Sequence, residues 1–427
     1  MVSFLTDDTK AIILLCGVFA NPLTTTEYNT LVGWLVREKL RPESLLQMGD
    51  LSSVAVGSKI DRHRLDTLLG RGVQLGFAVE EWQNSGLWIV SRSDSEYPER
   101  CKTHLRGNAP PLLFGIGNKS LLRGSSIAIV GSRNVDSDGG EFTRRIVEEC
   151  AQNGMTVVSG AASGVDQIAM RSALDAGGKV IGVVADNLLK ASIERHARHA
   201  IVAEQLLLIS PRHPRSHFAV EAAMGRNKLI YAMADYALVV SVDDNKGGTW
   251  AGAEEELKRD KSIAVFVRTG KNVPTGNIKL QEYGALAWPA TITREALPRQ
   301  LTELARQRPG AVKAEPETLN LFDFQVSPVS VSTIKIPAEK LEPEAMKQDR
   351  SPVESLISSS ETTICTVYAV VLPVLLAHLN EPVSVEKLSA AIDVTVGQLN
   401  VWLKKAVADG VVEKLNGPVR FVRGHYT

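Results

Sequence analysis

The sequence has few cysteines and no excess of charge of either sign. It holds only four cysteines, and no two of them lie close together: Cys16, Cys101, Cys150 and Cys365. This spacing argues against a disulfide scaffold and a zinc knuckle, and it fits a reducing, cytoplasmic environment. The 48 basic and 48 acidic residues balance, so any contact with nucleic acid must come from a local patch.

Long apolar runs are also missing. Residues 11–20 are apolar but too short to span a bilayer, and Asp7 and Asp8 outweigh the single Lys10 before them. A buried helix is therefore favoured over a signal peptide. No other segment is long and apolar enough for a membrane span, so no membrane partner is expected.

The common signatures of catalysis are absent as well. The sequence has no Walker-type loop and no G-x-S-x-G elbow. His196 and His199 lie three residues apart without a nearby cysteine or carboxylate, which favours surface histidines over a metal site. We expect neither a metal nor a cofactor.

The length of 427 residues favours two to four domains. Helical spacing of leucines predicts an N-terminal helical domain over residues 1–94, for which structural packing is favoured over a partner-binding role. Residues 308–361 are rich in Pro, Glu, Lys, Ser and Thr and indicate a flexible linker.

Residues 95–307 are predicted to form an α/β core. Short apolar runs alternate with helix-like segments, which indicates a doubly wound, mostly parallel sheet of the extended Rossmann-like type. The runs are 127–130, 155–158, 180–184, 206–209, 237–242, 263–267 and 285–288.

Residues 362–427 have the pattern of a winged helix: three helices and a two-stranded wing. The third helix, the one that would enter the major groove, carries only Lys404 and Lys405 as basic residues. Docking onto protein is therefore at least as well supported as reading of a DNA duplex.

Two glycine-rich loops follow the first two apolar runs of the core. Gly131-Ser132-Arg133 offers backbone N–H groups, a hydroxyl and a guanidinium, and the segment from Ser159 to Asp166 offers two glycines and two serines. Loops at the carboxyl ends of parallel strands open on one edge, where N–H groups and helix N-termini can bind phosphate. For Gly131-Ser132-Arg133 the alternative is a plain strand-to-helix turn with a solvent-facing Arg133. For Asp166, capping a helix over 166–176 is favoured over general-base duty.

Two further segments add to this edge. Arg226-Asn227-Lys228 brings positive charge, and Gly247-Gly248-Thr249 forms a third glycine-rich turn. Glu254 and Glu255 follow it, and a negative first helical turn explains them more simply than a catalytic acid does.

In this order, the motifs resemble the DprA/Smf family of DNA-processing proteins. The resemblance begins at Tyr97-Pro98 and Pro110-Pro-Leu-Leu-Phe114, is strongest over Ser159-Gly-Ala-Ala-Ser-Gly-Val-Asp166, and continues through Arg226-Asn227 and Gly248-Thr249. Met170 stands where the family usually has His, and Lys228 replaces a second Arg. Segment 186–205 also lacks the tyrosine–proline signature usual there. These departures indicate a divergent member of the family.

The resemblance implies a function without established catalysis. Family members bind single-stranded DNA in a groove of the Rossmann-like domain, form homodimers, and help load a RecA-type recombinase during natural transformation; a related role in DNA uptake or defence is also compatible. The residues that the resemblance and the loops assign to DNA or phosphate are Gly131, Ser132, Arg133, Ser159, Gly160, Ser163, Gly164, Arg226, Asn227, Lys228, Gly248 and Thr249. The alternative is a nucleotide-binding sensor or a phosphoribohydrolase-like enzyme of the same superfamily, with Glu254 and Glu255 as its acids.

Overall fold

The computed structural model describes residues 5–17, 19–259, 262–291, 297–307, 372, 374–392, 396–415 and 420–423. They belong to two compact units, one within Met1–Phe324 and the other within Gln325–Thr427. The predicted linker, 308–361, lies outside the described residues, and the other predicted domain boundaries stay predictions.

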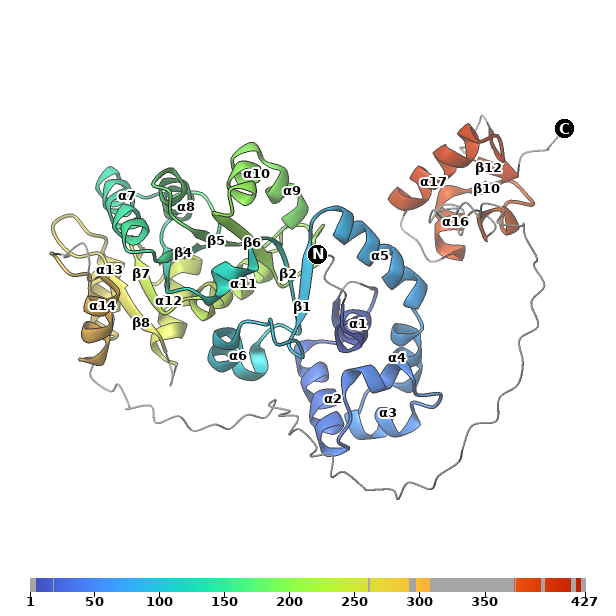
Figure 1. Ribbon diagram of the computed structural model, residues 1–427, viewed down its shortest axis with the longest axis horizontal. Helices are drawn as coiled ribbons and strands as arrows, with labels where there is room; N and C mark the ends of the chain where they lie inside the picture. Colours follow the sequence, from blue (N-terminus) through green and yellow to red (C-terminus); the bar gives the residue numbers. More distant parts are fainter. Residues whose placement is uncertain are drawn as a thin grey trace, which may run out of the picture. The chain divides into compact units, whose positions relative to one another are not determined.

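A nine-stranded sheet organises the first unit (Figure 1). Its order is β1-β2-β6-β5-β4-β3-β7-β8-β9, and every pairing from β6 to β9 is parallel. The parallel strands are β3 (Ser126–Val130), β4 (Thr156–Ser159), β5 (Val180–Val183), β6 (Leu206–Ser210), β7 (Tyr236–Val239), β8 (Ala264–Val267) and β9 (Leu286–Ala287). Each coincides with one of the seven predicted apolar runs, which confirms the mostly parallel α/β core.

Two strands at one edge were not predicted. β1 (Trp88–Ser91) pairs antiparallel with β2 (Leu112–Gly117), and β2 pairs antiparallel with β6. β1 lies before residue 95, so the sheet begins inside the segment that was assigned to N-terminal helices.

Helices cover both faces of the sheet, and two separate groups of buried side chains lie beneath them. The first face carries α7 (Ser137–Gln152), α8 (Val165–Asp175), α9 (Leu188–Ile193), α10 (Arg195–Val202) and α14 (Leu297–Arg306). The second face carries α6 (Glu99–Leu105), α11 (Val220–Ala232), α12 (Gly247–Leu257) and α13 (Thr275–Glu282). In Figure 1, α7, α8 and α10 lie above the strands and α6 lies below them.

The N-terminal helices share the core of the first face. They are α1 (Asp7–Ile12), α2 (Thr25–Arg37), α3 (Ser52–Ser58), α4 (Arg62–Leu69) and α5 (Gly72–Asn84), with a π-helical turn, Ile13–Gly17, after α1. Residues 11–15 are fully or almost fully buried, as predicted for a buried helix. Among the described residues, no helix has both the length and the hydropathy needed to cross a bilayer.

The strand order reverses between β3 and β7. From β3 the chain moves outward through β4, β5 and β6, and α11 then brings it back to β7 on the other side of β3. Val130 lies opposite Val239 in this pair, so the two following loops leave the sheet side by side. In open α/β sheets such a reversal creates a crevice at the carboxyl ends of the strands.

The second unit contains α16 (Val385–Ala391), α17 (Val396–Ala408) and a three-stranded antiparallel sheet. The strands are β10 (Val383–Ser384), β11 (Val412–Leu415) and β12 (Arg420–Arg423), in the order β10-β12-β11. Leu388, Leu399 and Leu403 are buried. The winged helix itself stays a prediction, because part of 362–427 lies outside the described residues.

A buried carboxylate of α12 forms a hydrogen bond with α6, and its removal tests the packing of the second face. Glu256 accepts hydrogen bonds from His104 Nε2 and from the Ile263 N–H, both at 2.9 Å, and its side chain is buried. Glu256→Ala should therefore lower the free energy of unfolding by about 2 kcal/mol, since it leaves buried donors without an acceptor. Urea unfolding followed by tryptophan fluorescence measures the change.

Glu254→Ala on the same helix is the matched control, because the Glu254 carboxylate lies at the surface, where it interacts with Lys258 and Trp250 and solvent screens the ion pair. It should leave the unfolding midpoint unchanged. Equal effects of the two substitutions would contradict a specific role for the buried carboxylate.

Candidate functional site

A cleft of about 640 Å³ lies at the point where the strand order reverses. Its walls come from the loops after β3, β4 and β7 and from the helices α8, α11 and α12. The predicted site residues in its lining are Gly131, Ser132, Arg133, Arg226, Asn227, Gly248 and Thr249. The structure therefore brings together seven of the twelve, contributed by three separate segments of the chain.

Hydrogen bonds fix the loops of the cleft to one another. The Ser132 N–H donates to the Ser241 carbonyl at 2.7 Å, and the Thr249 hydroxyl donates to the Gly131 carbonyl at 3.1 Å. The Asn227 side-chain amide donates to the Gly248 carbonyl at 3.0 Å. Because these hydrogen bonds fix the backbone of the loops, the shape of the cleft is largely set before any ligand binds.

Arg226 is buried under the cleft. It is 7% exposed, donates to the Gly160 carbonyl, and lies 3.7 Å from the carboxylate of Asp166, which is 6% exposed. Burial raises the pKa of Asp166 to about 6, while the Arg226 cation and the N–H groups of Gly160 and Ala162 act in the opposite direction. The pair joins α11 to the loop between β4 and α8.

The prediction that Asp166 caps a helix is wrong. α8 begins at Val165, its N-cap is Gly164, and no side chain caps it. Asp166 instead accepts hydrogen bonds from the N–H groups of Gly160 and Ala162, so it shapes the loop before the helix.

Of segment 159–164 only Ala162 lines the cleft, and the other residues mainly serve packing. The Ser159 hydroxyl donates to the Ile129 carbonyl at 2.7 Å, inside the sheet. Gly164 has a φ of +79°, and a Cβ there would collide with the Ser132 carbonyl. Ser159, Gly160, Ser163 and Gly164 are not among the lining residues.

Lys228 also lies outside the lining. Its ammonium pairs with Glu255 at 2.9 Å, and Glu254 pairs with Lys258 at 2.8 Å. The two glutamates of the enzyme alternative thus border a different depression, on the outer side of α12.

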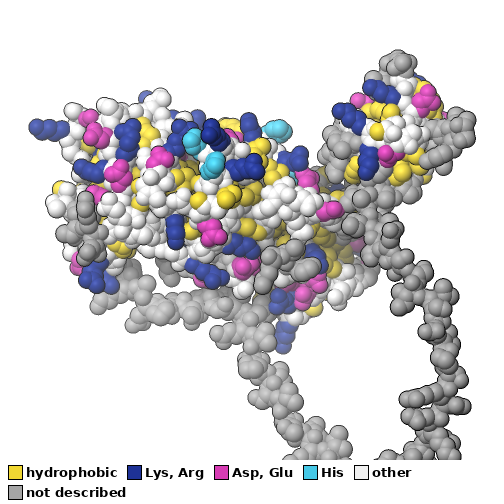
Figure 2. Space-filling model, turned by 45° about the horizontal axis from the view of Figure 1, so that its top comes forward, with side chains coloured by type: hydrophobic (Ala, Val, Ile, Leu, Met, Phe, Trp, Pro, Cys, Tyr) yellow, Lys and Arg dark blue, Asp and Glu magenta, His cyan; other side chains and the backbone are white. Residues whose placement is uncertain are grey.

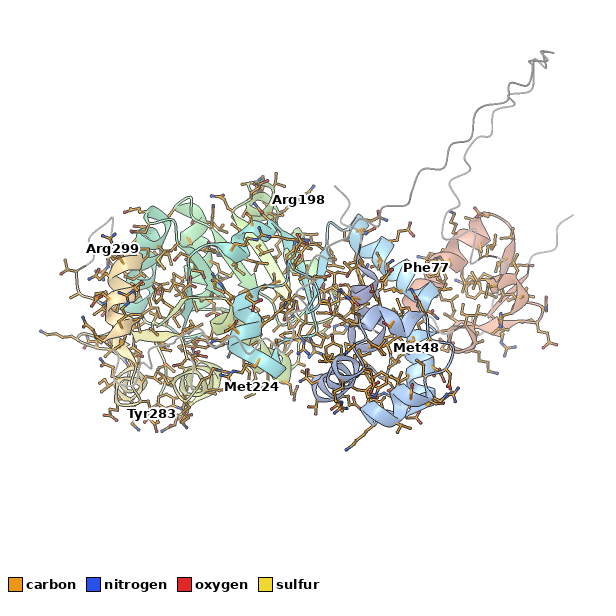
Figure 3. The ribbon with its side chains drawn as sticks, turned by 60° about the horizontal axis from the view of Figure 1, so that its bottom comes forward. Met48, Phe77, Arg198, Met224, Tyr283 and Arg299 are labelled. Atoms are coloured by element: carbon orange, nitrogen blue, oxygen red, sulfur yellow. The ribbon has the colours of Figure 1, made fainter. Side chains whose placement is uncertain are left out.

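Sequence reasoning missed several lining residues. Lys246 precedes the third glycine-rich turn, and Phe218, Val220 and Met224 form an apolar ledge at the start of α11. Phe218 is 57% exposed and Met224 53%. Met224 and Arg198 of α10 are labelled on opposite sides of the α/β part in Figure 3. Only Lys246 could have been found from the sequence, because it lies beside Gly247-Gly248. The three apolar residues could not, because apolar residues near a helix start suggest burial.

Few exposed cationic side chains without an ion pair line the cleft. Arg133 and Lys246 are exposed in its lining, and neither has an ion pair within the described part of the chain; Asp243 is the exposed acid beside them. The face that carries α7, α8 and α10 shows Lys and Arg interspersed with Asp and Glu (Figure 2). No cluster of three or more His, Cys, Asp or Glu suited to a metal occurs among the described residues.

Residues 88–294 match the family model described as DNA recombination-mediator protein A. The DNA processing protein DprA of Bacillus subtilis is 28% identical over 228 residues, which cover 51% of this chain and 74% of that protein. The protein Smf of Escherichia coli is 36% identical over 134 residues, 30% of this chain and 35% of that protein.

A solved structure has the same fold. DNA processing protein A from Streptococcus pneumoniae superposes with a TM-score of 0.54 and 21% identity, covering 69% of this chain and 98% of that one. The family match covers β1 to β9, and with them the strand reversal and all the loops of the cleft. On the evidence of the family model and the sequence relatives, residues 88–294 of this chain belong to the DprA/Smf family of DNA-processing proteins.

Proposed function

We propose that this protein binds single-stranded DNA in the cleft between the β3 and β7 loops. The observation that carries the proposal is the pairing of two exposed cations, Arg133 and Lys246, with an apolar ledge of Phe218, Val220 and Met224 in one cleft. Single-strand sites combine positive charge along the backbone with side chains on which bases stack. A duplex hides its base faces, so an exposed apolar ledge favours an unpaired strand.

The remaining predicted residues support the cleft without touching the strand. Arg226, Asp166, Ser159 and the glycines of 160–164 hold its walls, and Lys228 is neutralised by Glu255. The proposed contacts with the phosphates of the strand are therefore Arg133, Lys246 and the backbone of Gly131-Ser132 and Gly248-Thr249.

Loading of a RecA-type recombinase and homodimer formation are part of the proposal and rest on family resemblance. The phosphoribohydrolase-like alternative has no observation in its favour, since Glu254 and Glu255 lie outside the cleft lining.

Salt dependence tests the two cations. For single strands, log K falls with log salt by about 0.7 for each phosphate neutralised. Arg133→Ala and Lys246→Ala should each flatten the slope by about 0.7, measured by fluorescence anisotropy with a labelled oligonucleotide from low to moderate NaCl. Lys228→Ala is the matched control and should keep the wild-type slope. Affinity that does not change with salt in the wild type would contradict the proposal.

The ledge is tested by Phe218→Ala. Loss of one stacked base costs about 1–3 kcal/mol, so single-strand affinity should fall by about tenfold, while Phe218→Trp should retain it. Ile193→Ala removes an apolar side chain that is 74% exposed at the end of α9, on the opposite face of the sheet, and should change nothing. Equal losses at both positions would speak against stacking at Phe218.

The buried pair is tested by stability instead of binding. Arg226→Ala leaves Asp166 without its cation, which should cost about 3 kcal/mol of unfolding free energy near pH 8. The double variant Arg226→Met with Asp166→Leu should recover much of that loss.

This loss should shrink as the pH falls. The pKa of Asp166 is already raised in the folded protein and rises further without Arg226, so the folded state takes up a proton more readily than the unfolded state. Stability of Arg226→Ala should therefore fall as pH rises from about 4 through 6 and beyond. Urea unfolding at pH 5 and pH 8 measures it; the same loss at both would show that Asp166 is not the reason.

A further inference from the structure

A second groove lies along the open edge of the sheet and shares no lining residue with the cleft. It has a volume of about 940 Å³ and lies between β1, α5 and the end of α10, so we call it the β1–α10 groove. The Arg92 N–H donates to the Pro111 carbonyl, and by the alternation of an antiparallel ladder the N–H and C=O of Ile89 point away from β2. Neither group has a hydrogen-bond partner among the described residues. An open strand edge of this kind can pair with an extended segment.

The walls of the β1–α10 groove are largely apolar. The apolar side chains that dominate them are Val79 and Trp82 of α5, Trp88 of β1, and Ile201 and Val202 of α10. The two charged residues of the lining are already engaged, since Lys119 pairs with Glu96 at 2.8 Å and Glu204 accepts a hydrogen bond from Asn118 at 3.3 Å. The groove therefore fits the apolar side chains of an extended chain.

The end of the groove at α10 is basic. Val202, which is 78% exposed, also lines a neighbouring hollow of about 450 Å³ together with Arg195, Arg198 and His199. The two arginines are exposed and form no ion pair within the described part of the chain, and Glu194 is the exposed acid beside them. Figure 2 shows His, Lys and Arg side chains next to apolar ones on the face that carries α10. An occupant should therefore be acidic where it passes α10 and apolar where it meets β1.

Segment 314–324 of this chain has the matching composition. It reads Ala-Glu-Pro-Glu-Thr-Leu-Asn-Leu-Phe-Asp-Phe, with three acids and no basic residue, and it lies outside the described residues. Its apolar residues follow the first two acids. From Glu315 to Leu319 an extended chain spans about 13 Å, which is about the length of α10. The acids can thus lie along α10 while the apolar residues enter the groove.

The position of α14 favours the groove of a second copy over that of the same copy. Twelve residues lead from Gln307, just after α14, to Leu319, and they span at most about 43 Å. The Tyr236 hydroxyl of β7 lies 2.7 Å from the Thr302 hydroxyl of α14, and β7 is six strand spacings from β1, about 29 Å through the sheet. Figure 1 shows α14 and α5 at opposite ends of this unit, and helices cover the face between them. A path over these helices is longer still, whereas exchange between two copies has no such limit.

We propose that segment 315–324 of one copy docks as an extended strand in the β1–α10 groove of a second copy. The two glutamates of the segment meet Arg195 and Arg198, and its apolar side chains fill the groove beside Ile89. A reciprocal exchange of the two segments closes a dimer.

A labelled peptide of residues 313–326 tests the contact by fluorescence anisotropy. The receptor is the full chain with Leu321→Ser and Phe322→Ser, whose own segment cannot compete. The peptide should bind saturably, and Val202→Glu in this receptor should weaken binding by about tenfold, because it places a charge among apolar groups. Since Val202 is exposed, the unfolding midpoint should stay unchanged. No saturable binding, or equal binding to both receptors, would overturn the proposal.

A charge swap tests the basic end. Arg198→Glu should weaken peptide binding by about fivefold, and a peptide with Glu317→Lys should bind this variant better than the natural peptide does. Arg171→Glu on α8 is the matched control, because Arg171 is exposed on the same face and lines neither hollow. Equal losses from the two reversals would show general attraction of an acidic peptide and would overturn docking at α10.

Mixing two defective chains tests the second copy as the partner. Val202→Glu keeps an intact segment but impairs the groove, and Leu321→Ser with Phe322→Ser does the reverse. Neither chain alone should form the contact, whereas their equimolar mixture should associate, measured by sedimentation velocity with one chain labelled. A mixture that associates no more than the separate chains would overturn exchange between copies.

The 12-mer dT12 separates this contact from the proposed DNA site. Val202→Glu should keep the wild-type affinity for dT12, because the groove and the cleft share no residue. Failure of dT12 to displace the bound peptide supports a protein occupant. Displacement by dT12 would assign the basic end to nucleic acid and overturn the docking of the segment.

Discussion

The buried ion pair between Arg226 and Asp166 is the constraint on which the cleft depends. Arg226 belongs to α11 on one face of the sheet, and Asp166 to α8 on the other. Their contact passes around the carboxyl edge of the strands and takes the Gly160 carbonyl with it. Two layers that pack on separate cores are thereby joined at the edge where the strand order reverses.

This pair also decides what the cleft can attract. Because Asp166 neutralises the charge of Arg226, this arginine adds nothing to the electrostatic attraction of a polyanion. Glu255 neutralises Lys228 in the same way. Two exposed cations remain in the cleft beside one exposed acid. Electrostatics alone therefore contribute a small number of phosphate contacts, and apolar and hydrogen-bonding groups must supply the rest of the affinity.

The sequence predicted the parallel core well because its strands are buried on both faces. Such strands are continuous apolar runs, and six of the seven were predicted within one residue of each end, while the run 237–242 extends three residues beyond β7. β1 and β2 are short antiparallel strands, of which β1 alone forms the edge of the sheet. They were missed because Pro98, Pro110 and Pro111 lie between them, and prolines usually indicate turns or loops. The family resemblance covered the core, and the family match over residues 88–294 confirms the family.

The site was predicted less well, for a physical reason. A sequence gives the charge of Arg226 but not the partner that neutralises it, and the same holds for Lys228. Phe218 and Met224 carried no signal, because an apolar residue at a helix start indicates burial until its exposure is known.

The glycines show how one pattern can have two causes. A glycine-rich strand-to-helix loop lets a phosphate approach the backbone, and it equally lets two parts of the chain approach each other. At Gly131 a side chain would collide with Val165, and at Gly160 with the Arg226 guanidinium. Here the absence of a Cβ allows close contacts within the protein, and the loops after β3 and β4 pack against neighbouring side chains. Only the outer atoms of these loops can therefore contact a ligand.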